Sequence, residues 1–158
     1  MPGPTSAPPP GVTIRPERYG TDGPRFVVAQ AEAELIARYG FLDDGELGLT
    51  SDMFDRPAGT FLVARARDAG PPVGGVGLRA IGEVRRLWVD PAWRGRGIGR
   101  ALMDALEHAA RDLGHVTLRL ATGDRQPEAV ALYEATGWER IVVADVYGIR
   151  FVKRLALP

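Results

Sequence analysis

The chain has 158 residues, with 20 basic and 20 acidic side chains, a formal net charge of zero and no cysteine. The length is that of one ordinary domain, and the absence of cysteine excludes disulfides, zinc ribbons, iron–sulfur sites and a thiol nucleophile. The neutral balance argues against a protein that binds nucleic acid or a membrane surface through excess cation. Every basic residue except Lys153 is arginine, whose planar guanidinium suits phosphate.

The chain starts with a proline-rich stretch, MPGPTSAPPP, which holds five of the 13 prolines. Such a run forms neither helix nor sheet, so we expect a disordered or extended tail over residues 1–11 and a single domain over residues 12–158. The start lacks the basic and apolar regions of a signal peptide, and no apolar run approaches the roughly 20 residues that span a bilayer. These features favour a cytoplasmic protein without membrane attachment.

Apolar spacing and turn residues predict alternating strands and helices over the domain. Strands are expected at residues 12–18, 60–66, 73–80, 83–89 and 116–121, with two more between residues 138 and 157, and helices at residues 25–39, 97–113 and 127–136. The first helix is expected to bury a face of Ala, Leu and Ile, and the second a stripe of Ile98, Leu102, Leu106 (or Ala105), Ala109 and Leu113. The pattern is mixed α/β, with a strand–helix–strand–helix unit over residues 83–137.

The stretch VDPAWRGRGIGRALM marks the place where a predicted strand turns into a helix. Alternate glycines and arginines surround this turn: Gly95, Gly97, Gly99, Arg94, Arg96 and Arg100. Helix N-termini carry unpaired N–H donors and partial positive charge, so a pyrophosphate is the expected ligand. There is no Gly-Lys-Ser/Thr of a Walker A loop, and the glycine spacing does not match G-x-G-x-x-G. The alternative is an ordinary glycine-rich turn with arginines for solubility.

Three segments together resemble the GCN5-related N-acetyltransferases (GNAT family): EVRRLWV at 83–89, RGRGIG at 94–99 and ALYEATGW at 131–138. The family's acyl-donor signature, Arg/Gln-x-x-Gly-x-Gly/Ala, is matched by Arg94, Gly97 and Gly99. The resemblance is strong over residues 83–138 and diffuse before residue 60. It implies a GNAT-like α/β (α+β) fold, in which a central mixed and mostly antiparallel sheet carries helices on both faces.

The resemblance also implies acetyl-CoA as co-substrate and no metal. Its pyrophosphate would lie on the 94–99 turn, and its pantetheine arm would run along the 83–89 strand, where a backbone N–H near Val89 would polarise the thioester carbonyl. Two histidines, His108 and His115, make a poor metal site without a carboxylate cluster, and Ser51 has no histidine partner for a hydrolase triad. The expected cofactor-binding residues are Leu87, Trp88, Val89, Arg94, Gly95, Arg96, Gly97, Ile98, Gly99, Arg100 and Gln126.

Two residues are expected to carry the proton transfers. Glu83 matches the glutamate that takes the proton of the amine in many family members, and Tyr133 matches the tyrosine that protonates the departing thiolate. The alternatives are that Glu83 is a strand-end acid paired with Arg85 and that Tyr133 only packs in the core. Gln126 stands where many relatives have Asn, and Trp138 where Phe or Tyr is commoner.

The expected function is transfer of an acetyl group from acetyl-CoA to a primary amine of a small molecule or peptide, directly within a ternary complex. Between residues 41 and 55 there are five acids and no basic residue: Asp43, Asp44, Glu46, Asp52 and Asp55. An acidic rim there would attract a cationic amine, and the alternative is a solvated loop. A coenzyme A-binding regulatory or sensor module without turnover stays open, as does an interaction domain that uses the arginines. A homodimer is also left open.

Overall fold

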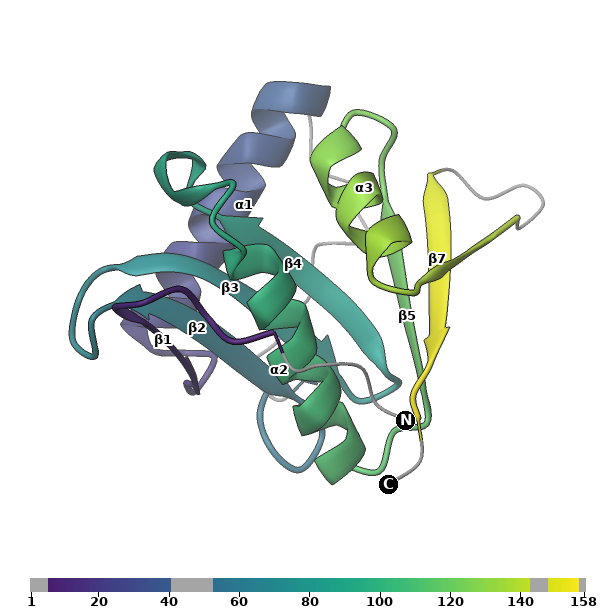
Figure 1. The fold of residues 1–158 in the computed structure, drawn as a ribbon, viewed down its shortest axis with the longest axis horizontal. Helices are drawn as coiled ribbons and strands as arrows, with labels where there is room; N and C mark the ends of the chain where they lie inside the picture. Colours follow the sequence, from purple (N-terminus) through teal and green to yellow (C-terminus); the bar gives the residue numbers. More distant parts are fainter. Residues whose placement is uncertain (1–5, 41–52, 143–147, 157–158) are drawn as a thin grey trace.

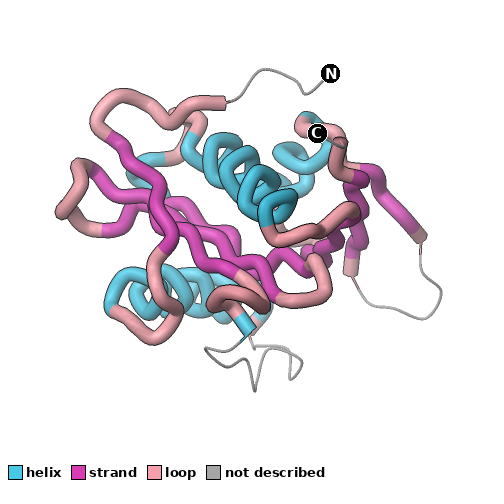
Figure 2. Tube along the Cα trace, turned by 90° about the horizontal axis from the view of Figure 1, so that it is seen from below, coloured by secondary structure: helices cyan, strands magenta, loops and turns pink. Residues whose placement is uncertain are grey.

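The computed structural model describes residues 6–40, 53–142 and 148–156. A seven-stranded sheet runs through the middle of the molecule, with α1 (Asp22–Tyr39) on one face and α2 (Ile98–Asp112) on the other (Figures 1 and 2). A third helix, α3 (Pro127–Ala135), lies on the α2 side beside the last strands. The expected mixed sheet with helices on both faces is confirmed.

The order of the strands in the sheet is β1-β2-β3-β4-β5-β7-β6. Their bounds are β1 (Val12–Pro16), β2 (Thr60–Ala66), β3 (Pro72–Arg79), β4 (Glu83–Val89), β5 (Thr117–Thr122), β6 (Glu139–Ile141) and β7 (Ile149–Arg154). Every neighbouring pair is antiparallel except β4 and β5, which run parallel and pair only at Glu83 and Arg119. The two strands therefore start side by side and diverge toward their C-terminal ends, as Figure 1 shows.

The predicted helices and strands form within three residues of their expected bounds, with local corrections at the helices. Helix α1 begins at Asp22 instead of residue 25, because Pro24 fits the first turn, where its missing N–H costs no hydrogen bond. Its buried face is made by Pro24, Val27 and Ala31, whereas Ile36 is 47% exposed, so the expectation of a buried Ile was wrong. The C-terminal half of α1 projects past the edge of β4 (Figure 1), which leaves that part of the helix without a sheet to cover it.

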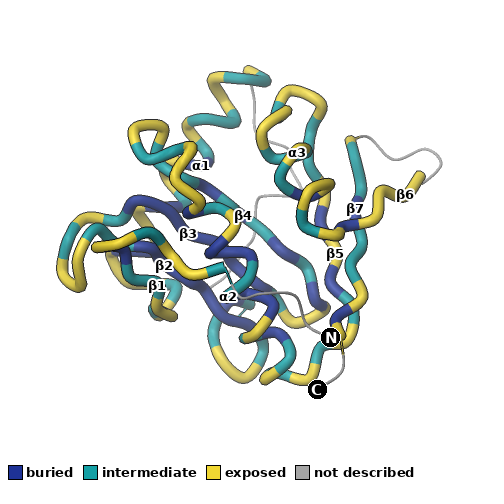
Figure 3. The backbone as a smooth tube through the Cα atoms, viewed as in Figure 1, coloured by how far each residue is buried: buried dark blue, intermediate teal, exposed yellow. Residues whose placement is uncertain are grey.

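Two apolar clusters fill the two sides of the sheet, and the central strands β2 and β3 are buried along most of their length (Figure 3). The larger lies under α2 and α3 and includes Ile98, Leu102 and Phe151. On α2, Met103 and Ala110 are buried, while the predicted Ala109 and Leu113 are only half-buried. The smaller cluster lies under α1 and includes Val27, Phe61 and Trp88.

A β-bulge interrupts β4 and decides which of its side chains face α1. The register against β3 shifts between Gly75 and Gly77, opposite Trp88 and Arg85, and Arg86 has a φ of 64°. Before the bulge Val84 faces the larger cluster, and after it Trp88 faces the smaller one. Side chains normally alternate along a strand, but the bulge adds one residue. Arg85 and Arg86 therefore both point to the α1 side of the sheet.

Candidate active site at the divergence of β4 and β5

The C-terminal half of β4 offers backbone groups that β5 does not pair. Asp90 N donates to the carbonyl oxygen of Val73 on β3 (2.8 Å), so Asp90 and Trp88 point their backbone groups toward β3. The groups of Leu87 and Val89 alternate with these and point away from β3, toward the side where β5 has diverged. Leu87 and Val89, both predicted to bind the cofactor, thus lie on an open strand edge. An extended chain pairs with such an edge.

The turn after β4 presents the N-terminus of α2 to solvent. Gly97 is the N-cap of α2 at a φ of +84°, and no acidic residue lies in the first turn of the helix. The first intrahelical hydrogen bond is donated by Ala101 N to Gly97 O (3.0 Å), so the N–H groups before it have no partner within the helix. Gly95 and Gly97 are exposed. The turn therefore presents unpaired backbone N–H groups, and phosphate binding there stays a prediction.

Gly99 has a packing role that the sequence did not indicate. A Cβ there would lie 3.3 Å from Leu132 Cδ2, so the glycine lets α3 approach the first turn of α2 closely. Ile98 is 1% exposed, and its side chain packs in the larger cluster. Of the predicted contacts on this turn, Ile98 thus offers only its backbone N–H. Trp88 on β4 offers neither part to a ligand at the open edge, because its side chain is buried and its backbone groups point toward β3.

The three arginines of the turn lie in different surroundings. Arg96 and Arg100 are exposed, and the Arg96 guanidinium stacks over the Trp93 ring at 4.6 Å. Arg94 instead turns inward: its Nε donates to the carbonyl oxygen of Val89 (2.9 Å), and its Nη2 donates to Glu34 Oε1 on α1 (2.6 Å). In this structure Arg94 holds the end of β4 against α1, while Arg96 and Arg100 face the solvent side of the turn.

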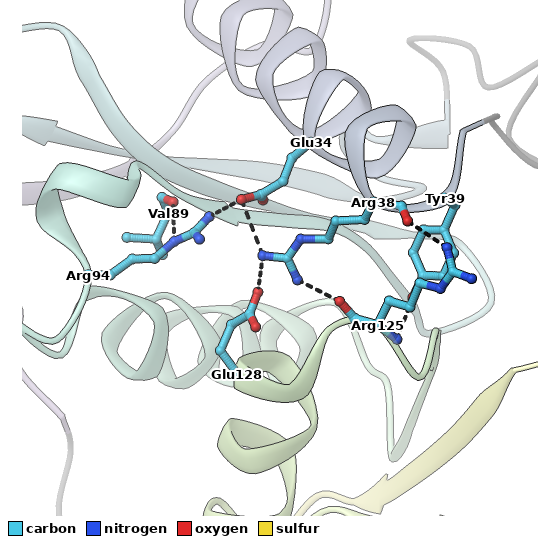
Figure 4. A network of polar contacts seen from close by, with 7 residues as sticks. All are labelled: Glu34, Arg38, Tyr39, Val89, Arg94, Arg125 and Glu128. Atoms are coloured by element: carbon cyan, nitrogen blue, oxygen red, sulfur yellow. Dashed lines mark hydrogen bonds and ion pairs between the residues drawn. The ribbon is translucent and has the colours of Figure 1, made fainter.

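Arg94 belongs to an ion network that links α1, the turn after β4 and α3 (Figure 4). Glu34 also accepts from Arg38 (3.4 Å), and Arg38 in turn pairs with Glu128 in the first turn of α3. The hydrogen bond that Arg38 donates to Glu128 is the largest contribution that raises the pKa of Arg38. Desolvation opposes ionisation of Glu128, but its hydrogen bond from Arg38, a backbone hydrogen bond and the charges of Arg38 and Arg94 together lower its pKa.

A second set of contacts joins the end of α1 to the loop that precedes α3. Arg38 Nη1 donates to the carbonyl oxygen of Arg125 and Arg125 Nη1 donates to that of Arg38, both at 2.9 Å. Arg125 N donates to the Tyr39 hydroxyl (2.9 Å). Since Arg94 follows β4 and α3 follows β5, the network ties together the elements around the divergent ends of the two strands (Figures 1 and 4).

Glu83 lies at the other end of β4, where β4 and β5 still pair. Its Oε1 accepts from Arg85 Nη1 (2.5 Å) and its Oε2 from Arg79 Nε (3.2 Å), and the side chain is 19% exposed. The pairing with Arg85 that the sequence left open is thus present, together with a second cation. Both carboxylate oxygens of Glu83 are thus engaged by arginine.

Tyr133 is 5% exposed and packs against Trp138 and Phe151, with ring centroids 5.9 Å and 5.5 Å apart. Burial raises the pKa of Tyr133 above its ordinary value, because the phenolate is poorly solvated there. The hydroxyl therefore stays protonated over the physiological range, as a proton donor must. Gln126 is the N-cap of α3, and its side chain makes no capping hydrogen bond to its own helix.

Sequence reasoning missed Glu34, Arg38 and Glu128. The first two lie on the polar face of α1, where only their i, i+4 spacing carried a signal. Most of the acidic stretch, Asp43, Asp44, Glu46 and Asp52, lies outside the described residues, as does Ser51. Asp55 is described, and its Oδ1 accepts from Tyr19 N (3.1 Å), a structural role.

Two further properties concern metals and membranes. Among the described residues no three His, Cys, Asp or Glu side chains gather as metal ligands would. Within the same parts of the chain, no helix combines the length and apolar character that crossing a bilayer requires.

Comparison with known proteins gives a consistent result. The model of the acetyltransferase (GNAT) family matches residues 16–138. The IAA acetyltransferase of Azospirillum brasilense is 36% identical over 137 residues, which are 82% of this chain and 85% of that protein. The mycothiol acetyltransferase of Nocardiopsis dassonvillei is 35% identical over 148 residues. That enzyme is longer, and the match covers 80% of this chain but only 42% of the relative.

Solved structures share the fold. An acyl-CoA N-acyltransferase structure from Klebsiella pneumoniae superposes with a TM-score of 0.67 at 28% identity, covering 92% of this chain and 98% of that one. A GNAT acetyltransferase from Elizabethkingia anophelis, solved with acetyl-CoA bound, has a TM-score of 0.62 at 19% identity over 92% of this chain and 99% of that one. At that identity the second likeness bears on the fold alone.

Proposed function

This chain belongs to the acetyltransferase (GNAT) family, and from that premise we propose that it transfers the acetyl group of acetyl-CoA to a primary amine by direct attack in a ternary complex. The observation that carries the proposal is the open edge of β4 at Leu87 and Val89, which lies directly before an exposed, acid-free helix N-terminus. An extended pantetheine arm pairs with the edge while its pyrophosphate meets the N–H groups of α2.

The backbone N–H of Val89 is placed to polarise the thioester. Its carbonyl oxygen already accepts from Arg94 Nε (2.9 Å), which holds this end of the strand in place. As the amine nitrogen bonds to the carbonyl carbon, negative charge grows on the carbonyl oxygen, and a fixed N–H donor stabilises it. The C–S bond then breaks, and its electron pair leaves with sulfur.

Tyr133 supplies the proton for the departing thiolate in this proposal. Support comes from its place on α3, which packs against the first turn of α2 through Leu132 and Gly99. Burial raises the pKa of Tyr133, so the phenol is protonated but gives up its proton less readily than a free tyrosine. Glu83 takes the proton of the amine through water. Its two arginine partners hold the carboxylate in place, and positive charges nearby favour the neutral form of an amine over its ammonium form.

The test of the donor site is Gly97→Glu, which puts a carboxylate where phosphate binds. Gly114→Glu is the matched control: Gly114 has a φ of +89° against +84° at Gly97, a Cβ at either position would meet open space, and Gly114 follows the far end of α2. We expect Gly97→Glu to weaken coenzyme A binding at least tenfold, by titration calorimetry, and the control to leave it unchanged. Equal affinities of the two variants would refute the assignment.

The alternative function is a coenzyme A-binding sensor module without turnover. The observation that favours it is the double ion pair of Glu83 with Arg79 and Arg85, which engages both carboxylate oxygens of the proposed base. Release of free thiol from acetyl-CoA, followed over a panel of primary amines with mass spectrometry of the products, separates the two. Coenzyme A binding without release on any amine would favour the module.

A further inference from the structure

The face of the sheet that α1 partly covers carries arginine along three adjacent strands. On β5 and β7, Leu118, Leu120 and Phe151 are buried in the larger cluster on the α2 side. Because side chains alternate along a strand, Arg119 of β5 and Arg150 and Arg154 of β7 point to the opposite face. Arg119 lies opposite Val152 in the ladder, and Arg150 and Arg154 lie diagonally on either side of it.

Strand β4 adds to the same face. Arg86 donates from Nη2 to Glu32 Oε1 of α1 (3.1 Å), with only 3% of its side chain exposed, which fixes the side of the sheet it occupies. Arg79 and Arg85 meet there at Glu83, which is level with Arg119. This arginine face comprises six arginines and three acids: Arg79, Arg85, Arg86, Arg119, Arg150 and Arg154, with Glu32, Glu83 and Glu139, which lies opposite Val152.

The surface beside α1 carries one further arginine, Arg25. Glu32 also lines an open hollow of about 430 Å³, whose other charged lining residue is Arg25. The carboxylate of Glu32 is already neutralised by Arg86 behind it. Positive charge therefore dominates the described surroundings of β4 on the α1 side.

The arginine face adjoins the point where the acceptor must meet the donor. The N-terminus of α2 lies on the opposite side of the sheet, so the donor reaches the edge of β4 from there and the acceptor is left the α1 side (Figure 2). Arg86 is nearer to the open edge but is held by Glu32, whereas Arg119 is level with Glu83, about 13 Å from Leu87 along the strand at roughly 3.3 Å per residue. Flexible arginine side chains from β4 and β5 shorten that span, so a group four or five bonds from the acceptor nitrogen comes within their reach.

We propose that the acceptor of this enzyme is a primary amine that carries a carboxylate, and that the arginine face binds this carboxylate while the amine faces the edge of β4. The inference rests on the proposed acetyl transfer. Guanidinium forks match a carboxylate with two parallel hydrogen bonds, and the surplus of arginine repels diamines and polyamines. This reverses the preference that an acidic rim at residues 41–55 would give.

Three amines of equal chain length test the proposal: 5-aminopentanoate, pentylamine and 1,5-diaminopentane, which differ in the charge of the far end. Each is titrated into the protein saturated with coenzyme A, and kcat/KM is measured with acetyl-CoA. We expect 5-aminopentanoate to bind at least tenfold more tightly than pentylamine and 1,5-diaminopentane to bind most weakly, since a charge-assisted hydrogen bond is worth about tenfold or more. Tighter binding of 1,5-diaminopentane than of 5-aminopentanoate, or no binding of 5-aminopentanoate, would overturn the inference.

The variant Arg119→Gln tests whether the arginine face binds the carboxylate of the acceptor. It should weaken 5-aminopentanoate about tenfold and leave pentylamine unchanged. Arg15→Gln is the control, because Arg15 is an exposed arginine paired with Asp68 on the far edge of the sheet. Equal effects of the two variants would place the carboxylate elsewhere and refute the assignment. Tenfold tighter binding of 5-aminopentyl phosphate than of 5-aminopentanoate would also refute it, in favour of a phosphate.

The two proposals fail in different ways. Binding of 5-aminopentanoate that depends on Arg119, without acetylation of any amine, supports the arginine face and contradicts acetyl transfer. Acetylation of all three amines with the same kcat/KM supports acetyl transfer and contradicts the arginine face.

Discussion

Replacing Glu34 by Gln should tighten coenzyme A binding, whereas replacing its partner Arg94 by Gln should weaken it. In the structure Arg94 Nη2 donates to Glu34 Oε1 at 2.6 Å, so the charge of this arginine is committed to α1. If Arg94 also attracts the pyrophosphate, Glu34 competes with the ligand for the same guanidinium. The two members of one ion pair then affect the affinity in opposite directions, which a merely structural pair would not do.

The size of the effect follows from the exposure and charge of the pair. The side chains of Arg94 and Glu34 are 32% and 29% exposed, so their interaction is worth at most about 1 kcal/mol after solvent screening. Removing the carboxylate also removes its repulsion of the bound pyrophosphate, about 1 kcal/mol at roughly 8 Å in a partly screened environment. The total of about 1–2 kcal/mol corresponds to roughly five- to thirtyfold in Kd.

Calorimetric titration of coenzyme A at low and high salt measures this, and the gain from Glu34→Gln should shrink as salt rises. Glu17→Gln is the matched control, since Glu17 pairs with Arg65 at 2.8 Å with 23% of each side chain exposed, away from the turn. It should leave the affinity unchanged. Weaker coenzyme A binding by Glu34→Gln, comparable to that of Arg94→Gln, would show that Arg94 acts only when Glu34 positions it and would refute the competition.

Three further predictions concern stability. Gly97→Ala should lower the free energy of unfolding in urea by about 1–2 kcal/mol because of its positive φ, while Gly99→Ala should change it by less than about 1 kcal/mol, since the flexible Leu132 methyl 3.3 Å from the new Cβ can shift; equal losses would contradict this. Burial raises the pKa of Tyr133 above 10.0, so its contribution to stability is complete below pH 10 and is lost as pH rises further, by up to about 1.4 kcal/mol per pH unit. Above pH 10 the free energy of unfolding of Tyr133→Phe should therefore fall less steeply with pH than that of the parent. Equal slopes would argue against the burial of Tyr133. Trp138→Phe should stay within about 1 kcal/mol of the parent in thermal unfolding, because the buried Trp138 Nε1 has no hydrogen-bond partner to lose; a loss of 3 kcal/mol or more would mean that this N–H is paired.

Much of the fold was predictable because its signals are local. The stripe of Ile98, Leu102 and Leu106 repeats with the period of a helix, and the strand–turn–helix around Gly97 requires only neighbouring residues. The ends of the elements shifted by up to three residues, and Ile36 proved half-exposed because α1 extends past the sheet that would have covered it.

The candidate site was predictable in its backbone and less so in its side chains. The turn at Arg94 was located from its glycines, but its guanidinium faces Glu34, 60 residues away in the chain. Glu128 lies further still from Arg38, and such a pair leaves no mark in local spacing. The roles proposed for Glu83 and Tyr133 stay predictions, although the structure adds two arginine partners to the first and a buried setting to the second.

The charge distribution shows the same division. The equal numbers of acids and bases, the arginine bias and the arginines beside the turn after β4 are properties of the sequence alone. Which arginines share a face was decided by the tertiary structure, since the register places Arg119 beside Glu83 and the bulge turns Arg86 toward α1. Periodicity and turn chemistry act between neighbours in the chain, whereas electrostatic interaction depends on distance in space, and only the folded sheet sets that distance.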